Sequence, residues 1–339
     1  MILIVSSAND VHALCVAQEL ARRGARYEVV DSTRLSMEGR VSHAIGAGRS
    51  SIEWTNVRGE SVDLGEARAV WHRRRYMPVA PALPDADDEA FLKREWDELF
   101  SGLFASMDCP FVNAPQAQRA AVKPLQLHWA SRLGLRFPDT LITNDPEQAR
   151  RFVDRHGSRV IHKVLSPPYH RWMGTARWRD EDRAHLDELV LAPTIFQEMV
   201  TDCRELRVTL IGNELYAAEF RPRDGLIDGR LESFEGYRRH DLPAAVGRQL
   251  KALAARLGLV FCTIDLKLTN EGEYVFLELN PQGQFLYIEI LTGMPLSRAF
   301  AELLIDVADG ADPLADARAA AALTRAPARA ATRELAPAV

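Results

Sequence analysis

The hydrophobic positions at the start of the chain predict a strand, a helix and a second strand. Residues 2–5 are continuously apolar, as in a buried strand. The apolar positions that follow recur at helical spacing and comprise Val11, Leu14, Ala17 and Leu20. Gly24 ends this helix, and a second strand covers 27–30. This opening resembles a nucleotide-binding domain, although no GxGxxG stands at the strand–helix turn.

Short strands separated by turns are predicted over 40–65, and a further strand over 69–71. The basic row Arg73–Arg75 follows almost directly. Such a row is usually a solvated edge, but at the end of a parallel strand it could also face a ligand crevice, so its role stays open. A polar cap then precedes a helix whose apolar stripe is typical of a core face: Leu92, Trp96, Leu99, Leu103 and Met107.

The remainder of the chain alternates between strand and helix patterns. A linker at 111–115 leads into a helix over 116–133, and Pro146 begins another helix. Strands are predicted over 137–143, 159–165, 194–200, 204–211 and 214–221, and helices over 242–257, around 288 and over 295–307. From 311 the chain is rich in alanine, and we expect it to be weakly ordered.

The composition is that of an ordinary globular protein. The chain has 339 residues, 47% hydrophobic and 26% charged, which is enough for two or three domains. Its net charge of −5 argues against nucleic-acid binding, and no apolar run is long enough to span a membrane. We therefore expect a cytoplasmic protein with no nucleic-acid or membrane partner. The four cysteines lack CxxC spacing, and Walker A and GxSxG motifs are absent.

The stretch 263–284 is the most informative part of the chain. It contains two alternating runs around a turn-rich tetrapeptide, which predicts a β-hairpin with a four-residue loop. If Thr269 pairs with Tyr274, then Asp265 stands directly opposite Glu278. The other face of the hairpin is apolar and comprises Ile264, Leu266, Leu268, Val275, Leu277 and Leu279. The pattern thus predicts two carboxylates together on one polar face.

A metal site is one interpretation of this polar face. The two-residue period puts Asn280 beside Glu278, and Lys267 lies two residues from Asp265. Facing carboxylates repel unless a positive charge lies between them, and carboxylate and amide oxygens suit Mg²⁺. The alternative is a solvated hairpin face. We favour the metal because Phe276 sits among the polar positions and because the loop after Asn280 leads into a helix.

Several polar residues stand in a specific order along the chain. They are Lys123, Lys163, Gln197-Glu198-Met199-Val200, Arg204-Glu205-Leu206-Arg207, Asp265 and Glu278-x-Asn280. In this order the chain resembles the ATP-grasp superfamily. Within that superfamily, the chain is most similar to the branch that contains the ribosomal-protein glutamate ligases and the graspetide (microviridin-type) peptide maturases. The resemblance covers about 113–309, and the stretches 123–144 and 276–284 favour the maturases.

The resemblance implies an α/β (α+β) protein with the ATP-grasp fold and an N-terminal α/β domain of the pre-ATP-grasp type. We expect this N-terminal domain over 1–112, a central ATP-grasp subdomain over 113–196, a C-terminal subdomain with the metal site over 197–310, and the tail over 311–339. A nucleotide would bind between the two ATP-grasp subdomains.

The resemblance also implies which residues bind ATP. Lys123 and Lys163 would contact the phosphates. A lysine in the apolar strand around Lys163 needs an anion or water nearby, although an edge lysine that reaches solvent is the alternative. The adenine would lie against the segment Gln197, Glu198, Met199 and Val200. Glu205 would hold the ribose, in a Glu-x-Arg sequence where the family more often has Asp-x-Arg.

Arg207 and Arg221 complete the implied site. They would point toward the γ-phosphate and the acidic substrate, although surface ion pairs are the alternative. Mg²⁺ would bind Asp265, Glu278 and Asn280. The implied reaction joins a carboxylate to an amine or hydroxyl through an acyl phosphate, while a mobile loop at 166–178 closes over the nucleotide.

The implied substrate is a precursor peptide with a leader and an acidic core, in which the ligase would close side-chain rings. Whether the links are esters or amides stays open. We also expect a homodimer. Two alternatives remain: a ligase of the same fold that joins an amino acid or small molecule to a carboxylate, and a catalytically silent nucleotide-binding partner protein. The retained Lys163, Asp265, Glu278 and Asn280 weigh against the silent protein.

Overall fold

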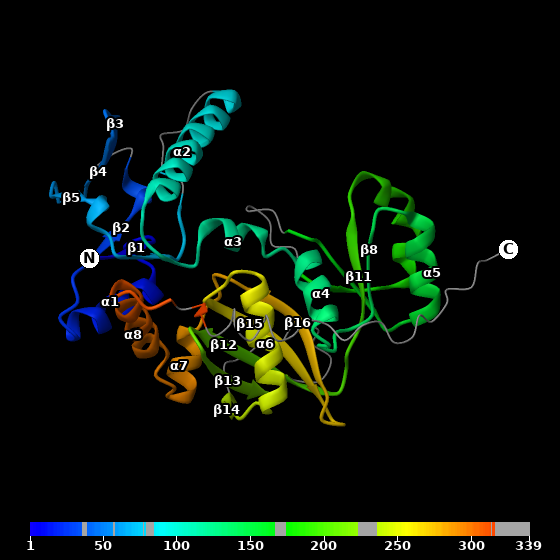
Figure 1. Cartoon of the computed structure of the whole chain (residues 1–339). Coiled ribbons are helices and arrows are strands. Elements are labelled where there is room, and N and C mark those ends of the chain that lie inside the picture. The colour runs from blue at the N-terminus through cyan, green and yellow to red at the C-terminus, as the bar shows by residue number, and fades with distance from the viewer. Residues whose placement is uncertain are drawn as a thin grey trace.

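The computed structural model of the protein describes residues 1–35, 39–56, 58–76, 78, 85–166, 174–222, 236–312 and 314–315. Four sheets carry the strands of these ranges, and helices pack against them (Figure 1). No helix in the described ranges is long and apolar enough to cross a membrane. Most of the loop predicted at 166–178 and of the tail predicted from 311 lies outside the described residues.

A parallel four-stranded sheet with the order β2-β1-β6-β7 forms the N-terminal end of the molecule. Its elements are β1 (Ile2–Val5), α1 (Val11–Arg22), β2 (Tyr27–Val30), β6 (Ala69–His72) and β7 (Phe111–Val112). The strand–helix–strand opening is confirmed, but the predicted face of α1 was partly wrong. Val11 and Leu14 are more than half exposed, whereas Ala13 and Val16 are buried. Apolar residues occur on more than one side of α1, so their spacing alone does not select the buried face.

The segment between β2 and β6 forms a small antiparallel sheet, as predicted for 40–65. It contains β3 (Arg40–Gly46), β4 (Arg49–Thr55) and β5 (Ser61–Asp63), flanked by the short helices η1 (Ser32–Arg34) and η2 (Leu64–Glu66). Helix α2 (Ala86–Ser106) projects from this part of the molecule (Figure 1). Asp85 caps α2, and its buried residues Phe100, Leu103 and Phe104 join the core beneath β4.

The helix predicted over 116–133 is in fact two helices. They are α3 (Pro115–Ala120) and α4 (Lys123–Arg132). Pro124 lies in the first turn of α4, where its missing N–H is harmless, whereas inside a longer helix it would remove a hydrogen bond and clash with the preceding turn. The break therefore puts Lys123 at the N-terminus of a helix rather than in the middle of one.

The second large sheet is antiparallel, with the order β10-β9-β11-β8. Its elements are β8 (Thr140–Thr143), α5 (Pro146–His156), β9 (Val160–Lys163), β10 (Ala176–Arg177), η3 (Asp180–Leu191) and β11 (Thr194–Glu198). The predicted start of α5 is confirmed, since the Asp145 carboxylate accepts hydrogen bonds from the N–H groups of Glu147 and Gln148. The pattern did not reveal β10 or η3.

The third large sheet carries the predicted hairpin and has the order β14-β13-β12-β15-β16. Its elements are β12 (Cys203–Ile211), β13 (Glu214–Phe220), β14 (Arg238–His240), α6 (Ala244–Arg256), β15 (Phe261–Thr269) and β16 (Tyr274–Asn280). Residues of α4 and α6 form one apolar cluster with one face of this sheet. The opposite face is polar at the end near β11.

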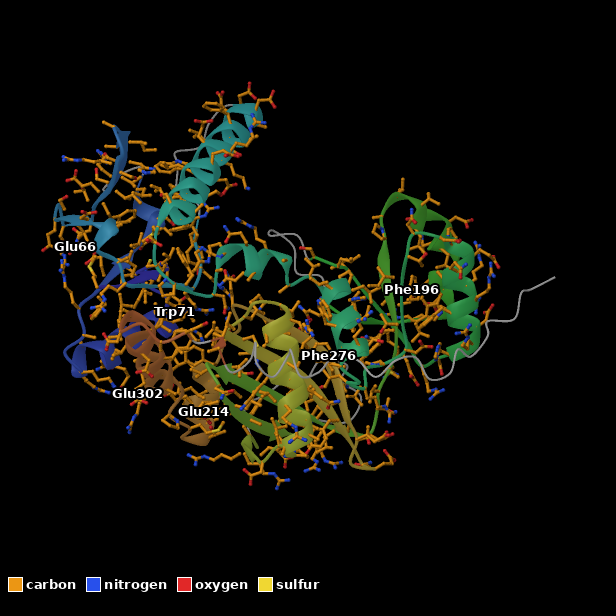
Figure 2. All side chains as sticks on the ribbon, in the orientation of Figure 1. Glu66, Trp71, Phe196, Glu214, Phe276 and Glu302 are labelled. Atoms are coloured by element: carbon orange, nitrogen blue, oxygen red, sulfur yellow. The ribbon has the colours of Figure 1, made fainter. Side chains whose placement is uncertain are left out.

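The last two helices of the described ranges are α7 (Leu286–Thr292) and α8 (Leu296–Ala308). Helix α8 packs against α1 and the N-terminal sheet, and α7 packs against α8 and β14 (Figure 1). The rings of Trp71 on β6 and Phe300 on α8 lie 4.5 Å apart, and Arg23 after α1 forms an ion pair of 3.0 Å with Glu302 on α8. Figure 2 labels Trp71 and Glu302 in this region. One apolar cluster therefore includes residues from both ends of the chain. The domain limits given above stay a prediction.

Asn113 holds the segment after β7 against the third sheet. Its side chain is buried, accepts hydrogen bonds from the N–H groups of Val260 and Phe261 at 2.8 and 3.0 Å, and donates to the carbonyls of Phe261 and Pro281 at 2.7 and 3.0 Å. We expect Asn113→Ala to lower the free energy of unfolding by about 2–3 kcal/mol, because buried backbone groups lose their partners. Urea denaturation measures this loss.

The exposed Asn144 supplies the control for Asn113→Ala. Asn144→Ala should change the free energy of unfolding by less than about 0.5 kcal/mol. Equal, small effects of the two substitutions would show that the Asn113 side chain does not hold this segment.

Candidate nucleotide and metal site

The hairpin of β15 and β16 brings the two predicted carboxylates together. Asp265 pairs with Glu278 in the strand register, as predicted. The assumed pairing nearer the turn was wrong: Tyr274 pairs with Leu268, and the Thr269 N–H donates to the carbonyl of residue 273. The hairpin loop therefore has three residues instead of the predicted four. Its last residue, Gly272, has a φ of 86°.

A β-bulge restores the predicted register at the carboxylates. Leu266 pairs with Phe276 and Asp265 with Glu278, which leaves Leu277 as the extra residue. The bulge also corrects the predicted faces of β16. Phe276 is fully buried in the apolar cluster and is not part of the polar face, while Leu277 is only half-buried. Figure 2 labels Phe276 within the hairpin.

Basic side chains accompany both carboxylates. Arg207 pairs with Asp265 across β12 and β15, and its Nη1 donates to Asp265 Oδ1 at 2.6 Å. The Lys123 ammonium at the start of α4 lies 3.5 Å from the Glu278 carboxylate. Arg207 is buried, whereas Lys123 and Glu278 remain about a quarter exposed, at 26% and 22% of their side chains. A positive charge thus lies beside each carboxylate of the polar face.

The oxygens of this face fit a divalent cation that shares its ligands with phosphate. Within the described ranges no group of three His, Cys, Asp or Glu side chains converges as a metal site. Two carboxylates and one amide oxygen are nevertheless the kind of incomplete set that Mg²⁺ uses when substrate phosphates and water supply its other ligands. The Asn280 Oδ1 accepts a hydrogen bond from the Gln282 N–H at 2.9 Å, and a carbonyl oxygen can accept a second contact.

The loop after Asn280 is pressed onto the sheet. A Cβ atom placed on Gly283 would lie 1.7 Å from Thr263 Oγ1 and 2.5 Å from Thr263 Cβ. No side chain fits there without displacement of the loop or the strand. The Gln284 carbonyl accepts a hydrogen bond from Arg207 Nη2 at 3.2 Å. The loop therefore touches the same arginine that contacts Asp265.

The predicted phosphate lysine Lys163 lies in the second sheet. Its Nζ donates to Gln197 Oε1 at 3.0 Å, and Gln197 Nε2 donates to Thr140 Oγ1 at 2.8 Å. Gln197 is buried and belongs to β11, the strand next to β9. The structure thus brings Lys163 and the first residue of the predicted adenine segment into direct contact.

The rest of the predicted adenine segment connects the second and third sheets. The Met199 N–H donates to the carbonyl of Arg159 at 2.8 Å, and the Glu198 carboxylate lies 3.6 Å from the Arg159 guanidinium. The Val200 carbonyl accepts a hydrogen bond from Lys267 Nζ at 3.0 Å. The segment is therefore held on both sides by charged residues.

Lys267 lies among the predicted site residues, and the sequence left its role undefined. Its ammonium lies 3.7 Å from the carboxylate of Glu205, the residue opposite it on β12. The side chains of Lys267 and Glu205 are only 12% and 14% exposed. The sequence could have identified Lys267, because it follows Asp265 at the two-residue spacing that puts both side chains on one face of the strand.

The structure does not bring Arg221 to Arg207. Arg207 pairs with Ala218, and the alternation of β13 puts Phe220 on the same face. Arg221 follows the last residue of β13 and is exposed. Residues 223–235, which follow shortly after Arg221, lie outside the described ranges.

Tyr237 is a further residue beside the site that the sequence did not single out. Its ring stacks on Phe220 at 4.4 Å and meets Tyr287 edge-on at 5.8 Å. Burial raises the pKa of the Tyr237 phenol well above its ordinary value, and the nearby Tyr287 and Glu205 act in the same direction. The phenol is therefore a neutral hydrogen-bond donor at physiological pH.

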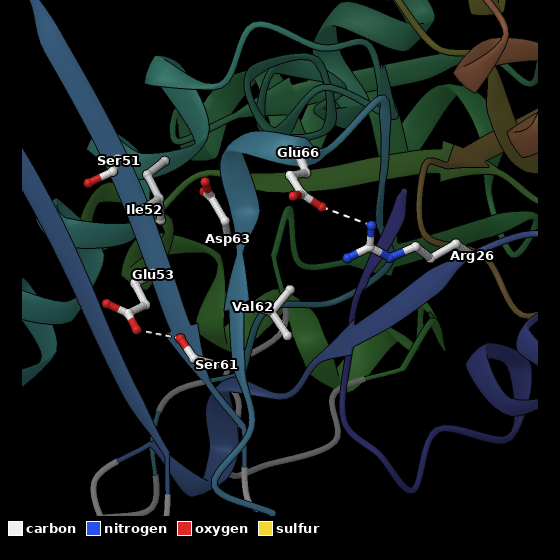
Figure 3. A pocket seen from close by; sticks show the side chains of 8 residues that line it. All are labelled: Arg26, Ser51, Ile52, Glu53, Ser61, Val62, Asp63 and Glu66. Atoms are coloured by element: carbon white, nitrogen blue, oxygen red, sulfur yellow. Dashed lines mark hydrogen bonds and ion pairs between the residues drawn. The ribbon is translucent and has the colours of Figure 1, made fainter.

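A hollow of 440 Å³ lies in the N-terminal part, away from the polar face of the hairpin (Figure 3). Its lining includes Glu53, Asp63 and Glu66 from the small sheet and its flanking helix. Glu66 forms an ion pair of 2.9 Å with Arg26, and Glu53 accepts a hydrogen bond from Ser61. No predicted site residue lines this hollow.

Comparison with known proteins identifies the class. No protein-family model matches the chain. Beta-citrylglutamate synthase B of Danio rerio is 28% identical over 216 residues, which are 59% of this chain and 52% of that protein. The chain thus spans about half the length of the curated relatives it matches.

Solved structures match almost the whole chain. Macrocyclase MdnC of Microcystis aeruginosa MRC, bound with precursor peptide MdnA, is 29% identical with a TM-score of 0.81, over 90% of this chain and 99% of MdnC. The ATP-grasp ligase PsnB, complexed with a minimal precursor, Mg and ADP, is 26% identical with a TM-score of 0.73, over 91% and 97%. The chain has the ATP-grasp fold, and the proteins that it matches include ATP-grasp ligases. Two macrocyclases, MdnC and MdnB, are among the solved structures that match 90% of this chain.

Proposed function

We propose that this protein is a peptide maturase that closes side-chain macrolactone or macrolactam rings in a ribosomally made precursor peptide. The main support is the extent of the likeness to MdnC, which covers 90% of this chain and therefore includes the N-terminal sheet as well as the two ATP-grasp sheets. MdnC was solved with its precursor peptide. By analogy, the partner proposed here is a peptide with a leader and an acidic core.

The proposed nucleotide is ATP. Lys123 and Lys163 contact its phosphates, the segment 197–200 holds the adenine and Glu205 faces the ribose. Lys163 is partly buried, so its ammonium needs an anionic or hydrogen-bonding partner, and the contact with Gln197 already orients it. The crystallisation of PsnB with Mg and ADP supports the same pair of ligands here.

Asp265, Glu278 and Asn280 are the proposed Mg²⁺ ligands, and the bound ion would neutralise charge on the phosphates. Arg207 lies beside Asp265 and is buried, which supports a role in binding the transferred phosphoryl group. Arg221 is proposed to bind the acidic side chain of the peptide.

The proposed reaction has two steps. A substrate carboxylate oxygen attacks the γ-phosphorus of ATP, the bond to the bridging oxygen breaks, and ADP leaves. A Ser, Thr or Lys side chain of the same peptide then attacks the acyl carbon, and phosphate leaves with the bonding electrons. The nucleophile loses a proton to solvent or phosphate. Each ring therefore consumes one ATP and removes one water from the peptide.

Mass spectrometry of a candidate precursor peptide, incubated with the enzyme, ATP and Mg²⁺, tests this proposal. We expect a series of products that each lack one further water, with no added amino acid required. Arg221→Ala should reduce product formation more than ATP binding, because the lost contact is to the acyl donor. Product formation unchanged by Arg221→Ala would remove Arg221 from the site.

A second function has its own support in the curated relatives, which are named as synthases of citrylglutamate and N-acetylaspartylglutamate. In that case the enzyme would join an amino acid to a carboxylate. The same experiment separates the two, since a mass gain by an added amino acid without a water-loss series would favour amino-acid ligation. Tight ATP binding without any mass change would favour a silent partner protein. The homodimer stays a prediction.

A further inference from the structure

Only part of the basic row at 73–75 is solvated. Arg73 is only 2% exposed and lies where β6 meets the loop that follows the hairpin. Its Nη1 donates to the Gln282 carbonyl at 2.5 Å, and its Nε lies 3.3 Å from the Asp10 carboxylate. Arg75, by contrast, pairs with Asp97 and lies over the ring of Phe100. The first arginine of the row therefore has surroundings of its own.

Asp10 holds Arg73 in an ionised pair. Its carboxylate caps α1 through the His12 N–H at 2.9 Å and accepts from Ser6 Oγ at 3.0 Å. Burial acts to raise the pKa of Asp10, but the hydrogen bonds from His12 and the charge of Arg73 hold it well below its ordinary value. A buried ion pair is weak evidence for stability, because desolvation offsets much of the attraction. Its position next to a site loop suggests a different role.

The Gln282 side chain is held by Gln118 on α3, which is itself hydrogen-bonded to β6. Its Nε2 donates to Gln118 Oε1 at 2.8 Å, and Gln118 Nε2 donates to the His72 carbonyl at 2.7 Å. Burial lowers the pKa of His72 to about 4, so its ring is neutral and its Nδ1 donates to Gln118 at 2.7 Å. Gln282 is thus fixed at its carbonyl by Arg73 and at its side chain by Gln118.

Gln282 in turn touches the proposed metal site. Its N–H donates to Asn280 Oδ1, and two residues on, the Gln284 carbonyl accepts from Arg207. Between them, Gly283 lies so close to the sheet that the loop has little freedom to adjust. A displacement of the Gln282 peptide would therefore reorient the Asn280 carboxamide and the partner of Arg207.

We propose that Arg73 is a positioning residue for metal binding, acting through the Gln282 peptide on Asn280. This inference rests on the proposed role of Asn280 as a ligand. Through Arg73, the N-terminal sheet would help to position the metal that binds with the nucleotide, in addition to any contact that the sheet makes with the peptide. Residues that orient metal ligands typically change metal affinity by roughly 10–100-fold when they are replaced.

The test compares Arg73→Met with Arg75→Met in the full-length protein. The readout is the affinity for Mn²⁺, followed by electron paramagnetic resonance in the presence of saturating ADP. We expect Arg73→Met to weaken Mn²⁺ binding roughly 10-fold or more, with ADP affinity in the absence of metal changed less than about 3-fold. Arg75→Met should leave both affinities unchanged. Arg73→Lys, which retains a donor for the carbonyl, should recover part of the Mn²⁺ affinity.

Asp10→Asn gives a second route if Arg73→Met does not fold. Asparagine can still cap α1, so the helix start is retained while the charge beside Arg73 is lost. It should weaken Mn²⁺ binding in the same direction by a smaller factor. Unchanged Mn²⁺ affinity in Arg73→Met or, failing that, in Asp10→Asn would overturn the inference. Because the readout uses no peptide, a wild-type protein without peptide product would reject the proposed substrate but leave this test intact.

Discussion

Glu278→Gln should abolish most turnover while the fold and much of the nucleotide affinity remain. The substitution keeps the size of the side chain and removes its charge, opposite Asp265 and 3.5 Å from the Lys123 ammonium. Loss of a group that only orients a metal ligand costs roughly 10–100-fold, so loss of a ligand should cost at least roughly 100-fold in ATP consumption with substrate. Lys163 and the adenine segment are unchanged and should still bind nucleotide. Coupled ADP release and equilibrium binding of a fluorescent ATP analogue measure the two effects.

Glu271→Gln is the matched control for this result. Glu271 lies in the exposed turn of the same hairpin, away from the polar face. It should retain wild-type turnover. Wild-type ATP consumption by Glu278→Gln would mean that Glu278 holds no metal, and loss of folding in Glu278→Gln would mean that its carboxylate is needed for the hairpin itself.

Among substitutions of the described glycines by alanine, Gly283→Ala should lower the stability most. The new Cβ would overlap Thr263 Oγ1 at 1.7 Å, and the contact to Thr263 Cβ at 2.5 Å is also impossible. Thr263 is fully buried on β15, an inner strand of the third sheet, so the loop must move instead of the strand. We expect a loss of more than about 4 kcal/mol in the free energy of unfolding, at the upper end for single substitutions. Thermal and urea denaturation measure it.

Two further variants separate this overlap from a general effect of alanine. At Gly46 an added Cβ meets nothing within 4 Å, so Gly46→Ala should leave stability nearly unchanged. Thr263→Ala removes two of the three overlapping atoms but keeps Cβ, so the double variant should recover only part of the loss. A stable, fully active Gly283→Ala protein would show that the loop can lift from the sheet.

The hairpin shows how much of a strand register can be predicted from the alternation of apolar and polar residues. Two-residue periodicity and the turn were sufficient to pair Asp265 with Glu278. The bulge was not predictable in this way, because Leu277 and Phe276 are both apolar and either could face the core. The position of the bulge is fixed by the backbone instead. The Phe276 N–H donates to the carbonyl of Arg136, a residue far away in sequence, at 2.7 Å.

Charged residues were harder to interpret than apolar ones. Arg73 and Arg75 stand in one row, yet one is buried and the other is partly exposed. The difference comes from Asp10 and Gln282, which approach Arg73 from opposite ends of the chain. Only the fold brings these partners together, so local sequence could list the possibilities for Arg73 but not decide between them. The split between α3 and α4 is different, since Pro124 was a local signal that a helix could not continue.

The packing of α8 on the first sheet has a consequence during synthesis. The side of β6 that carries Trp71 is covered by Phe300, which leaves the ribosome long after the strands of that sheet. Until then, Trp71 and Ile4 have no apolar cover from the C-terminal helices. Contacts between residues so far apart in sequence also close slowly. The nascent chain therefore passes through a stage with an exposed apolar sheet face, to which molecular chaperones would bind. The first sheet completes its packing only when α8 has been synthesised.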